Sequence, residues 1–366
     1  MTIPLLGGQA IAAEPKDNPT EGALPQETVQ RLDTAITKII QQNNLPSAAV
    51  GVWIPGKGRY QFVKGEADLQ TKAARKFEQP FRIASLTKTF AATAILILVD
   101  QGKLSKSDPL AKWFPDFPNA DKITVDDLLR MRSGIPDPSD AEVTDRLYDR
   151  PLSNFTAADW IKEAASKVNQ FKPPNQETVY ANVNYILLGE IAKKVTGKDI
   201  GVMITEEVIN KLNLKNTSYP TTPDLPGGLH GYGWNPQTKQ FQDKTEFNPA
   251  IAGPAGAIIS DLPDLTTYVH TLCVGGLLKP ETQKARLQGM PFAENPSISY
   301  GEGVLVTEDV CGHGGSIPGF STEMYYLRKQ NAVVVVSVNR LDRDNTLQTT
   351  PIVTAVVETL FPKFVK

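Results

Sequence analysis

The chain has 366 residues, of which 40% are hydrophobic and 21% are charged, a composition typical of a globular protein with room for two packed units. Its net charge is -2 and its sequence pI is about 6.0, so it lacks the basic excess of proteins that bind nucleic acid or anionic membranes. The apolar run from Phe90 to Val99 is shorter than the roughly 20 residues that cross a bilayer. We therefore expect no transmembrane segment, no nucleic-acid partner, and a small molecule or peptide as substrate.

The first 24 residues form a predicted N-terminal extension. They are small, polar and proline-bearing, and Ala10-Ile11-Ala12 has the small-x-small pattern of a processing site. No basic region or full apolar region precedes it. Residues 1–24 therefore fit either the remnant of an export signal or a plain terminal tail. We expect an exported protein, periplasmic or secreted, whose signal is incomplete in this chain.

The next predicted elements are a helix and a hairpin. Apolar residues recur at helical spacing from about residue 25 to residue 43. Two runs rich in valine and aromatic residues follow, Ser47 to Ile54 and Arg59 to Glu66. Pro55-Gly56-Lys57-Gly58 separates them, which predicts a β-hairpin.

A second predicted helix carries a serine and a lysine in its first turn. Ser85 and Lys88 are three residues apart, so they share a helix face, and the run from Phe90 to Val99 is apolar on nearly every side and belongs in a core. The helix dipole favours negative charge at the serine, and a buried ammonium loses its proton more easily. Taken alone, this spacing arises about once by chance in a chain of this length, and it also fits a helix N-cap followed by a solvated lysine.

The middle of the chain changes to short amphipathic helices between proline-rich loops. After Gly253-Pro254-Ala255-Gly256, a helix leads into strand-like runs with short links, which favour antiparallel pairing, and a last helix closes the chain. The predicted helices are 124–131, 157–168, 183–195, 262–277 and 349–360, and the predicted strands are 298–306, 322–327 and 332–339.

Strands at both ends with helices between them indicate an α+β fold. We expect one antiparallel sheet assembled from both chain ends and flanked by helices, with a mostly helical domain inserted into it. The predicted boundaries are residues 25–103 plus 254–366 for the sheet domain and residues 104–253 for the inserted domain.

Two further motifs carry chemistry that could accompany Ser85. Tyr180-Ala181-Asn182 stands directly before a helical pattern, and His313-Gly314-Gly315-Ser316 stands between predicted strands. Each has a structural alternative, because an aromatic core residue, a helix N-cap and a simple glycine turn are common uses of these residues. A serine hydroxyl becomes an effective nucleophile only when a neighbouring base removes its proton.

The order of these motifs resembles that of a known family. Ser85 and Lys88, then Tyr180 and Asn182, then the histidine-glycine-glycine motif, with connectors such as Ser133-Gly134-Ile135-Pro136, are similar to the class C β-lactamase and D-alanyl-D-alanine carboxypeptidase family of serine hydrolases. The resemblance covers about residues 28 to 362. It implies a β-lactamase/transpeptidase-like fold, in which the nucleophile lies between the sheet and the helical domain.

The resemblance also implies a role for each residue. Ser85 would attack the acyl carbon, Lys88 and Tyr180 would share the proton transfers, and Asn182 would orient the substrate. A neighbouring ammonium would favour the phenolate of Tyr180, and which of the pair is the base stays open. His313 with Gly315 would form the strand edge, and Gly314 and Gly315 would permit close approach of a substrate to it. The backbone N–H groups of Ser85 and Ser316 would form the oxyanion hole.

The chain departs from the family where a substrate carboxylate is bound. Many relatives carry a hydroxyl residue at the position of Gly314, and some carboxypeptidases place an arginine on the neighbouring strand, where Tyr300 to Val306 offers no cation. Charge-assisted hydrogen bonds are the strong ones, so recognition of a free C-terminal carboxylate is weakened. The histidine-glycine-glycine version occurs in relatives that act as esterases or D-amino-acid peptidases.

The remaining candidate residues are few. Cys273 and Cys311 are too few for a disulfide framework or a multi-cysteine zinc site, and whether they form one bridge stays open. His230 and His270 lack metal-ligand spacing, so we expect no metal and no cofactor, and a triad centred on either histidine is a rival mechanism.

The leading hypothesis is therefore a serine hydrolase that forms an acyl-enzyme on Ser85 from an ester or an amide, as a D-alanyl-D-alanine carboxypeptidase, a D-amino-acid peptidase or an esterase does. The alternatives are a β-lactamase of the class C type and a non-catalytic homologue that binds peptidoglycan or a partner, because a fold by itself does not establish activity.

Overall fold

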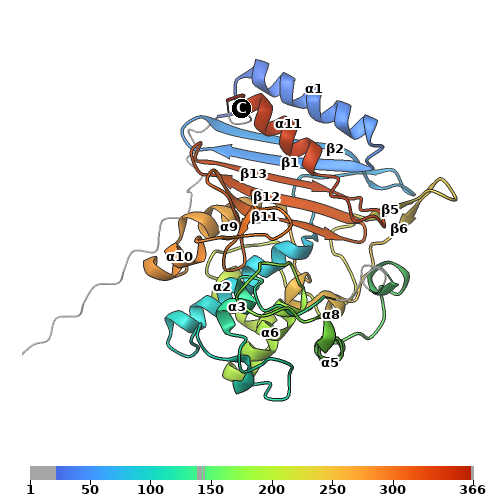
Figure 1. Ribbon diagram of the computed structural model, residues 1–366. Coiled ribbons are helices and arrows are strands. Elements are labelled where there is room, and N and C mark those ends of the chain that lie inside the picture. The colour runs from blue at the N-terminus through green and yellow to red at the C-terminus, as the bar shows by residue number, and fades with distance from the viewer. Residues whose placement is uncertain (1–21, 138–141, 143–144, 364–366) are drawn as a thin grey trace, which may run out of the picture.

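The computed structural model describes residues 22–137, 142 and 145–363, so nearly all of the predicted N-terminal extension, including Ala10-Ile11-Ala12, lies outside the described residues. Its central feature is an antiparallel sheet that, within those residues, has nine strands (Figure 1). The first long strand, β1 (Ser47–Ile54), pairs with β2 (Gly58–Asp68) on one side and with the last strand, β13 (Ala332–Val338), on the other. The sheet is therefore assembled from both chain ends, as predicted.

The other strands of the sheet continue from these three toward both edges. The sheet order is β3-β2-β1-β13-β12-β11-β10-β9-β8. The added strands are β3 (Ala73–Ala74), β12 (Phe320–Leu327), β11 (Val310–Ile317), β10 (Leu305–Val306), β9 (Ser299–Tyr300) and β8 (Met290–Pro291).

Helices from the two chain ends cover the outer face of the sheet. The helices α1 (Gln26–Gln42) and α11 (Thr350–Leu360) lie side by side there (Figure 1). Both are amphipathic, and Ile36 and Ile352 are fully buried in a cluster with the valines of β13. Every residue of β13 is buried, which its run of β-branched residues suits, because both of its faces are covered.

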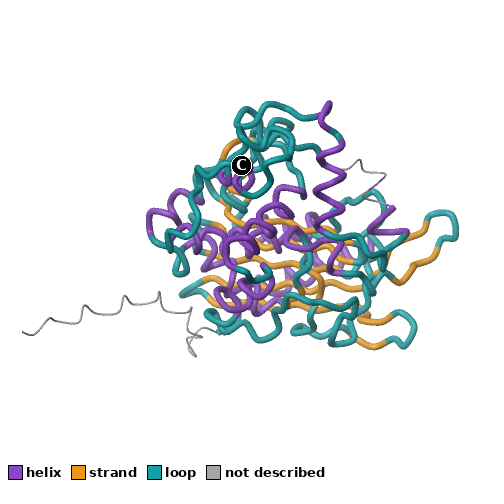
Figure 2. The backbone as a smooth tube through the Cα atoms, turned by 90° about the horizontal axis from the view of Figure 1, so that it is seen from below, coloured by secondary structure: helices purple, strands orange, loops and turns teal. Residues whose placement is uncertain are grey.

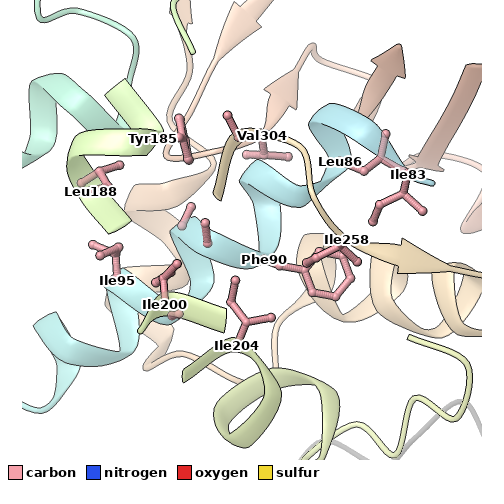
Figure 3. Packing of buried hydrophobic residues seen from close by; sticks show 14 of the residues in the cluster. Ile83, Leu86, Phe90, Ile95, Tyr185, Leu188, Ile200, Ile204, Ile258 and Val304 are labelled. Carbon is pink, nitrogen blue, oxygen red and sulfur yellow. The ribbon is translucent and has the colours of Figure 1, made fainter. Parts of the chain in front are cut away.

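The inner face of the sheet is packed against α9 (Leu262–Val274), which contacts β1, β11, β12 and β13. The helix α2 (Thr87–Asp100) packs on α9, where the ring of Phe90 stacks on that of Tyr268. Figure 2 shows helices lying across the strands. The side chains of α2 are buried on all sides from Thr87 to Leu98. Figure 3 shows apolar residues of this core around α2, among them Phe90, Leu188 and Ile204. The predicted core helix is confirmed. Because it is buried on all sides, the residues of its first turn, Lys88 among them, are held in place by packing.

The described part of residues 104–253 contains short helices and one hairpin. Its helices are α3 (Val125–Leu129), α5 (Ala157–Ser166), α6 (Val183–Thr196), α7 (Ile200–Ile204) and α8 (Pro249–Ala252), and the hairpin is β5 (Tyr232–Asn235) with β6 (Gln240–Asp243). The predicted helices lie within a few residues of their positions. The hairpin was not predicted, and the boundaries at residues 104 and 253 stay a prediction.

Two smaller features complete the fold. The short strands β4 (Phe81–Arg82) and β7 (Ile259–Ser260) pair beside α2, and α10 (Pro280–Arg286) follows α9. A disulfide joins Cys273 of α9 to Cys311 of β11, which answers the question that the sequence left open. Within the described part of the chain, no helix combines the length and the apolar character needed to span a membrane.

Candidate active site

Ser85 lies in a strained turn between β4 and α2. Residues Ala84–Leu86 form a 3-10 turn, and α2 begins only at Thr87, so Ser85 precedes the helix that it was predicted to start. The φ angle of Ala84 is 51°, a left-handed conformation that residues with a side chain rarely adopt. Two hydrogen bonds hold the turn, from Ile83 N to the Ile258 carbonyl and from Ile258 N to Thr87 Oγ1, each 3.0 Å long.

Lys88 is buried completely and points at the serine. Its Nζ donates hydrogen bonds to Ser85 Oγ (3.0 Å), Asn182 Oδ1 (2.8 Å) and the Ala255 carbonyl (2.7 Å). These three acceptors match the three N–H groups of an ammonium. Burial lowers the pKa of Lys88 to about 7, against an opposing effect of the Asp137 carboxylate. Near neutral pH the amine and the ammonium are both populated, so the group can accept and return a proton.

Tyr180 lies beside the same pair. Its ring centroid is 4.9 Å from Lys88 Nζ, and its hydroxyl is close enough to the side chain of Ser85 for Ser85 to affect its pKa. Although 37% of the residue is exposed, burial of the hydroxyl end raises its pKa above the ordinary value of 10, and this outweighs the opposing effect of Ser85. The expectation that the neighbouring ammonium would favour the phenolate is therefore wrong, because desolvation is the larger effect.

Asn182 connects Lys88 to a carboxylate that the sequence did not single out. Its Nδ2 donates to Asp137 Oδ2 at 2.7 Å, and Val183 N donates to Asp137 Oδ1 at 3.1 Å. Burial raises the pKa of Asp137, and these hydrogen bonds act in the opposite direction. The sequence offers only a weak signal for Asp137, which is its position directly after the connector Ser133-Gly134-Ile135-Pro136.

The histidine-glycine motif lies within β11, not between two strands as the predicted strand positions had placed it. All residues of β11 pair with β12, whereas β10 pairs only with Cys311 and Gly312. Among the described residues, the stretch from His313 to Ile317 therefore has a strand on one side only. An open strand edge beside Ser85 can hydrogen-bond an extended substrate.

His313 is buried and electrically neutral. Its Nδ1 is 2.5 Å from the carbonyl of Gly314, which can only accept, so this nitrogen carries the proton, and its Nε2 lies 3.3 Å from the hydroxyl of Tyr300. Burial and, to a smaller degree, the charge of Lys88 lower the pKa of His313 to about 3. The motif thus brings no positive charge to the site at neutral pH.

Gly315 allows β11 to approach the turn of the serine. A Cβ atom at Gly315 would lie 2.5 Å from the Ile83 carbonyl oxygen and 3.2 Å from Ala84 Cβ. The equivalent atom at Gly314 would meet only Leu347 Cδ1, at 3.2 Å, and farther atoms. The reason for glycine at position 315 is therefore close packing, because neither residue has a positive φ angle.

These residues surround a cavity of about 650 Å³. Ser85, Tyr180, Asn182 and Ser316 line it, whereas Lys88, His313, Gly314 and Gly315 support these residues without lining it. Sequence reasoning missed several lining residues, which come from the π-helical turn Asp145–Asp149, from α5, from α8 and from the loop after β13. They include Leu147, Tyr148, Trp160, Ile251, Arg343 and Asp344.

Arg343 brings a cation to the rim that the strand from Tyr300 to Val306 does not supply. Its guanidinium binds the carboxylate of Asp149 through Nη1–Oδ1 (2.5 Å) and Nη2–Oδ2 (3.0 Å). This ion pair connects the loop after β13 to the turn that carries Leu147 and Tyr148. Tyr148 Oη strengthens the connection by donating to the Asp342 carbonyl at 2.6 Å.

The other histidines do not take part in the cavity. His230 binds Asp243 at 2.6 Å, and the ring of His270 packs edge-on against Trp53 and Tyr326. Neither lines the cavity of Ser85. In the described ranges, histidines, cysteines and carboxylates form no cluster that could hold a metal ion.

Comparisons with known proteins agree with this geometry. Protein flp of Staphylococcus aureus (strain COL) is 27% identical over 330 residues, which cover 86% of this chain and 64% of that protein. This chain therefore spans less than two thirds of the length of that relative. A D-stereospecific amidohydrolase from Streptomyces sp. is 27% identical with a TM-score of 0.78, covering 91% of this chain and 97% of that one.

A D-amino acid amidase from Ochrobactrum anthropi SV3, solved in complex with L-phenylalanine amide, is 25% identical with a TM-score of 0.79, covering 91% of this chain and 99% of that one. The fold is thus the β-lactamase/transpeptidase-like fold, as expected. The model of the family described as Beta-lactamase matches residues 32–357. Because the match spans most of the chain, from α1 to α11, this protein belongs to the Beta-lactamase family.

Proposed function

We propose that the protein is a serine hydrolase that forms an acyl-enzyme on Ser85 and acts on the amide or ester of a D-amino acid. The observation that carries this proposal is that Ser85 and Tyr180 line one cavity, while Lys88, buried behind them, has its Nζ 3.0 Å from the serine oxygen. A nucleophile and a base within hydrogen-bond reach are the signature of covalent catalysis.

In the first step, neutral Lys88 takes the proton of Ser85 while Oγ attacks the acyl carbon of the substrate. Its pKa of about 7 suits this role, because a base titrating near the working pH is both free to accept and able to return the proton. Tyr180, whose raised pKa keeps its proton on the phenol, donates that proton to the departing amine or alcohol and regains one from Lys88. Water then attacks the acyl carbon and loses a proton to Lys88, which is neutral again, and as the ester bond to Oγ breaks, Lys88 returns this proton to Ser85 Oγ.

Backbone N–H groups of Ser85 and Ser316 are the proposed oxyanion donors. Both residues line the cavity, and Gly315 allows the strand that carries Ser316 to pack against the turn of Ser85. One donor of this kind contributes about 3 kcal/mol to stabilising the transition state.

The neutral state of His313 supports a substrate whose reacting end is an uncharged amide or ester. A cation at this strand would attract a substrate carboxylate, and the low pKa of His313 removes that attraction above about pH 4. The similarity to a D-stereospecific amidohydrolase and a D-amino acid amidase supports the same class of substrate.

The disulfide supports the proposal that the protein is exported. Bridges such as Cys273–Cys311 persist in oxidising compartments and are rare in the cytosol. Alkylation of the protein as it leaves its producing cell checks this point. We expect no label on either cysteine before reduction and two labels after it.

Mass spectrometry after incubation with a fluorophosphonate or a penicillin tests the acyl-enzyme. A single adduct on Ser85 is expected, which S85A removes and S107A, at an exposed serine in a loop, retains. Native protein that stays unlabelled by both reagents and turns over no ester would count against an enzyme and for a binding homologue.

A turnover panel separates the remaining substrates. Nitrocefin, a D-Ala-D-Ala peptide, D- and L-phenylalanine amide and a short-chain p-nitrophenyl ester are compared in the wild type and in S85A. The proposal expects the highest kcat/KM on the D-amide or the ester. Preferential turnover of nitrocefin would instead indicate a β-lactamase, and preferential release of D-alanine would indicate a carboxypeptidase.

A further inference from the structure

A continuous chain of hydrogen bonds leads from the lysine beside Ser85 to a buried carboxylate. Lys88 Nζ donates to Asn182 Oδ1 at 2.8 Å, and Asn182 Nδ2 donates to Asp137 Oδ2 at 2.7 Å. An ammonium can only donate and a carboxylate can only accept. The amide of Asn182 therefore has one permitted orientation, with its oxygen toward Lys88 and its nitrogen toward Asp137.

The position of Asp137 is itself fixed by α6. Its second oxygen accepts a hydrogen bond from Val183 N at 3.1 Å, in the first turn of that helix. The first N–H groups of a helix have no partner within it, and the dipole makes this end electropositive. The side chain of Asn182, which precedes the helix, makes no capping bond, so the carboxylate of Asp137 serves this end instead.

On the basis of the proposed function, we infer that Asp137 is a positioning residue for the proton transfer at Ser85. It locks the amide of Asn182 in the orientation that holds Lys88, and its negative charge sets how strongly Lys88 holds its proton. Asp137 also lines the cavity, but its two carboxylate oxygens are engaged by Asn182 and Val183, so it acts through Asn182 and Lys88 and not on the reacting atoms.

The charges around Lys88 give this inference a distinct electrostatic consequence. Tyr180 and Tyr185 face Lys88 with ring centroids at 4.9 and 6.0 Å, and His313 faces it from β11. The phenols keep their protons at neutral pH, burial raises their pKa further above the ordinary value of 10, and the lowered pKa of His313 keeps the imidazole neutral. Asp137 is thus the group whose charge raises the pKa of Lys88 against the effect of burial.

The first test is D137N, which keeps the shape and removes the charge. Because Val183 N–H still needs an acceptor, the oxygen of the introduced amide faces Val183 and its NH₂ group faces the NH₂ group of Asn182. If Asn182 turns over to avoid this, its NH₂ group faces Lys88 instead. We expect kcat for the most active substrate of the panel to fall by roughly 10²-fold, because a displacement of about 1 Å at a reacting group has this effect.

The same variant has a pH signature that a purely structural role would not produce. Loss of the negative charge lowers the pKa of Lys88 further, so the acidic limb of the kcat/KM profile moves to lower pH. D121N, at an exposed aspartate, is the matched control and should have the wild-type profile.

The second test reverses the sign of the effect. N182D alone places two carboxylates against each other, at Asp137 and at position 182, and should be nearly inactive. In the double variant D137N/N182D, the carboxylate at 182 accepts from both Lys88 and the amide at 137, and Val183 keeps its acceptor. D137N should therefore lower activity in the wild type and raise it about tenfold or more in the N182D background. Because the carboxylate at position 182 accepts directly from Lys88, the acidic limb of the kcat/KM profile of the double variant should lie at higher pH than that of the wild type.

The outcomes separate this inference from the proposed function. Absence of a Ser85 adduct in the wild type defeats the proposed function itself. A labelled wild type whose D137N variant keeps its kcat and its pH profile overturns only the role of Asp137, and so does a double variant no more active than N182D. A rise in KM confined to substrates with a free α-ammonium, with kcat unchanged, would instead mean that Asp137 contacts the substrate. Thermal melting of each variant shows whether it is folded. If D137N does not fold, the comparison of the double variant with N182D tests the role of Asp137.

Discussion

At the scale of single residues, two adjacent glycines of β11 have different functions in packing. A Cβ atom at Gly315 would lie 2.5 Å from a backbone oxygen of Ile83, whereas at Gly314 it would meet the mobile end of Leu347 at 3.2 Å. G315A should therefore separate β11 from the turn of Ser85 and destabilise the protein by about 1–3 kcal/mol. We expect its rate of Ser85 labelling to fall at least tenfold, while G314A, the matched control, stays within about threefold of the wild type. Equal labelling rates for the two variants would show that the close approach is unimportant.

The lowered pKa of Lys88 predicts how the rate of acylation depends on pH. Its folded pKa is lowered from 10.5 to about 7, so the fraction of neutral amine rises as the pH rises through 7. The rate of Ser85 labelling by a fluorophosphonate should rise about tenfold per pH unit below pH 6 and level off above about pH 8. K88A should remove most of the labelling at every pH. A rate that does not change between about pH 5 and pH 8 would rule out Lys88 as the base.

The sequence identified only part of this group of residues. Ser85, Lys88, Tyr180 and Asn182 stand in short motifs whose spacing indicates chemistry. Asp137 stands in no such pattern, and it reaches the site because a loop passes the N-terminus of α6. The loop after β13 likewise adds cavity-lining residues from a segment with no motif at all.

At the scale of elements, the disulfide fastens the strand of the histidine motif to a helix. Cys311 lies two residues before His313 on β11, and the bridge closes a loop with a sequence separation of 38 residues. The double variant C273A/C311A should lower the free energy of unfolding by about 3–4 kcal/mol, because the bridge restricts the unfolded chain. Urea denaturation with and without a reductant measures this. The reductant should destabilise the wild type and leave the double variant unchanged, and a wild type that is insensitive to complete reduction would contradict the prediction.

Helix starts were predictable where a local signal marks them. Thr124 and Thr156 each form a capping box with the aspartate three residues later, and α3 and α5 begin at the following residue. The strand β11 lacks such a signal, because three glycines in Val310–Ile317 lower its intrinsic β propensity. It is a strand because β12 pairs with it along its whole length.

At the scale of the whole molecule, two apolar layers lie on opposite faces of one sheet. The outer layer contains α1 and α11, and the inner layer contains α2 and the cavity of Ser85. I352A, at a fully buried residue of α11, should lower the free energy of unfolding by about 2–5 kcal/mol. T354A, at an exposed position of the same helix, should change it by less than about 0.5 kcal/mol. Below the melting temperature both variants should label Ser85 at the wild-type rate, and a slower rate in folded I352A would show that the outer layer controls the site.

The sequence by itself determined the fold class, the assembly of the sheet from both chain ends, and the ordered motifs around Ser85, because periodicity and short spacing are local properties of a chain. Only the tertiary structure decided the protonation tendencies and the additional partners. Folding raises the pKa of the Tyr180 phenol above its ordinary value of 10 and lowers the pKa of His313 to about 3. Asp137 and Arg343 reach the site through contacts between segments far apart in the chain. Burial and long-range contacts depend on all the packed elements together, so a local sequence pattern does not predict them.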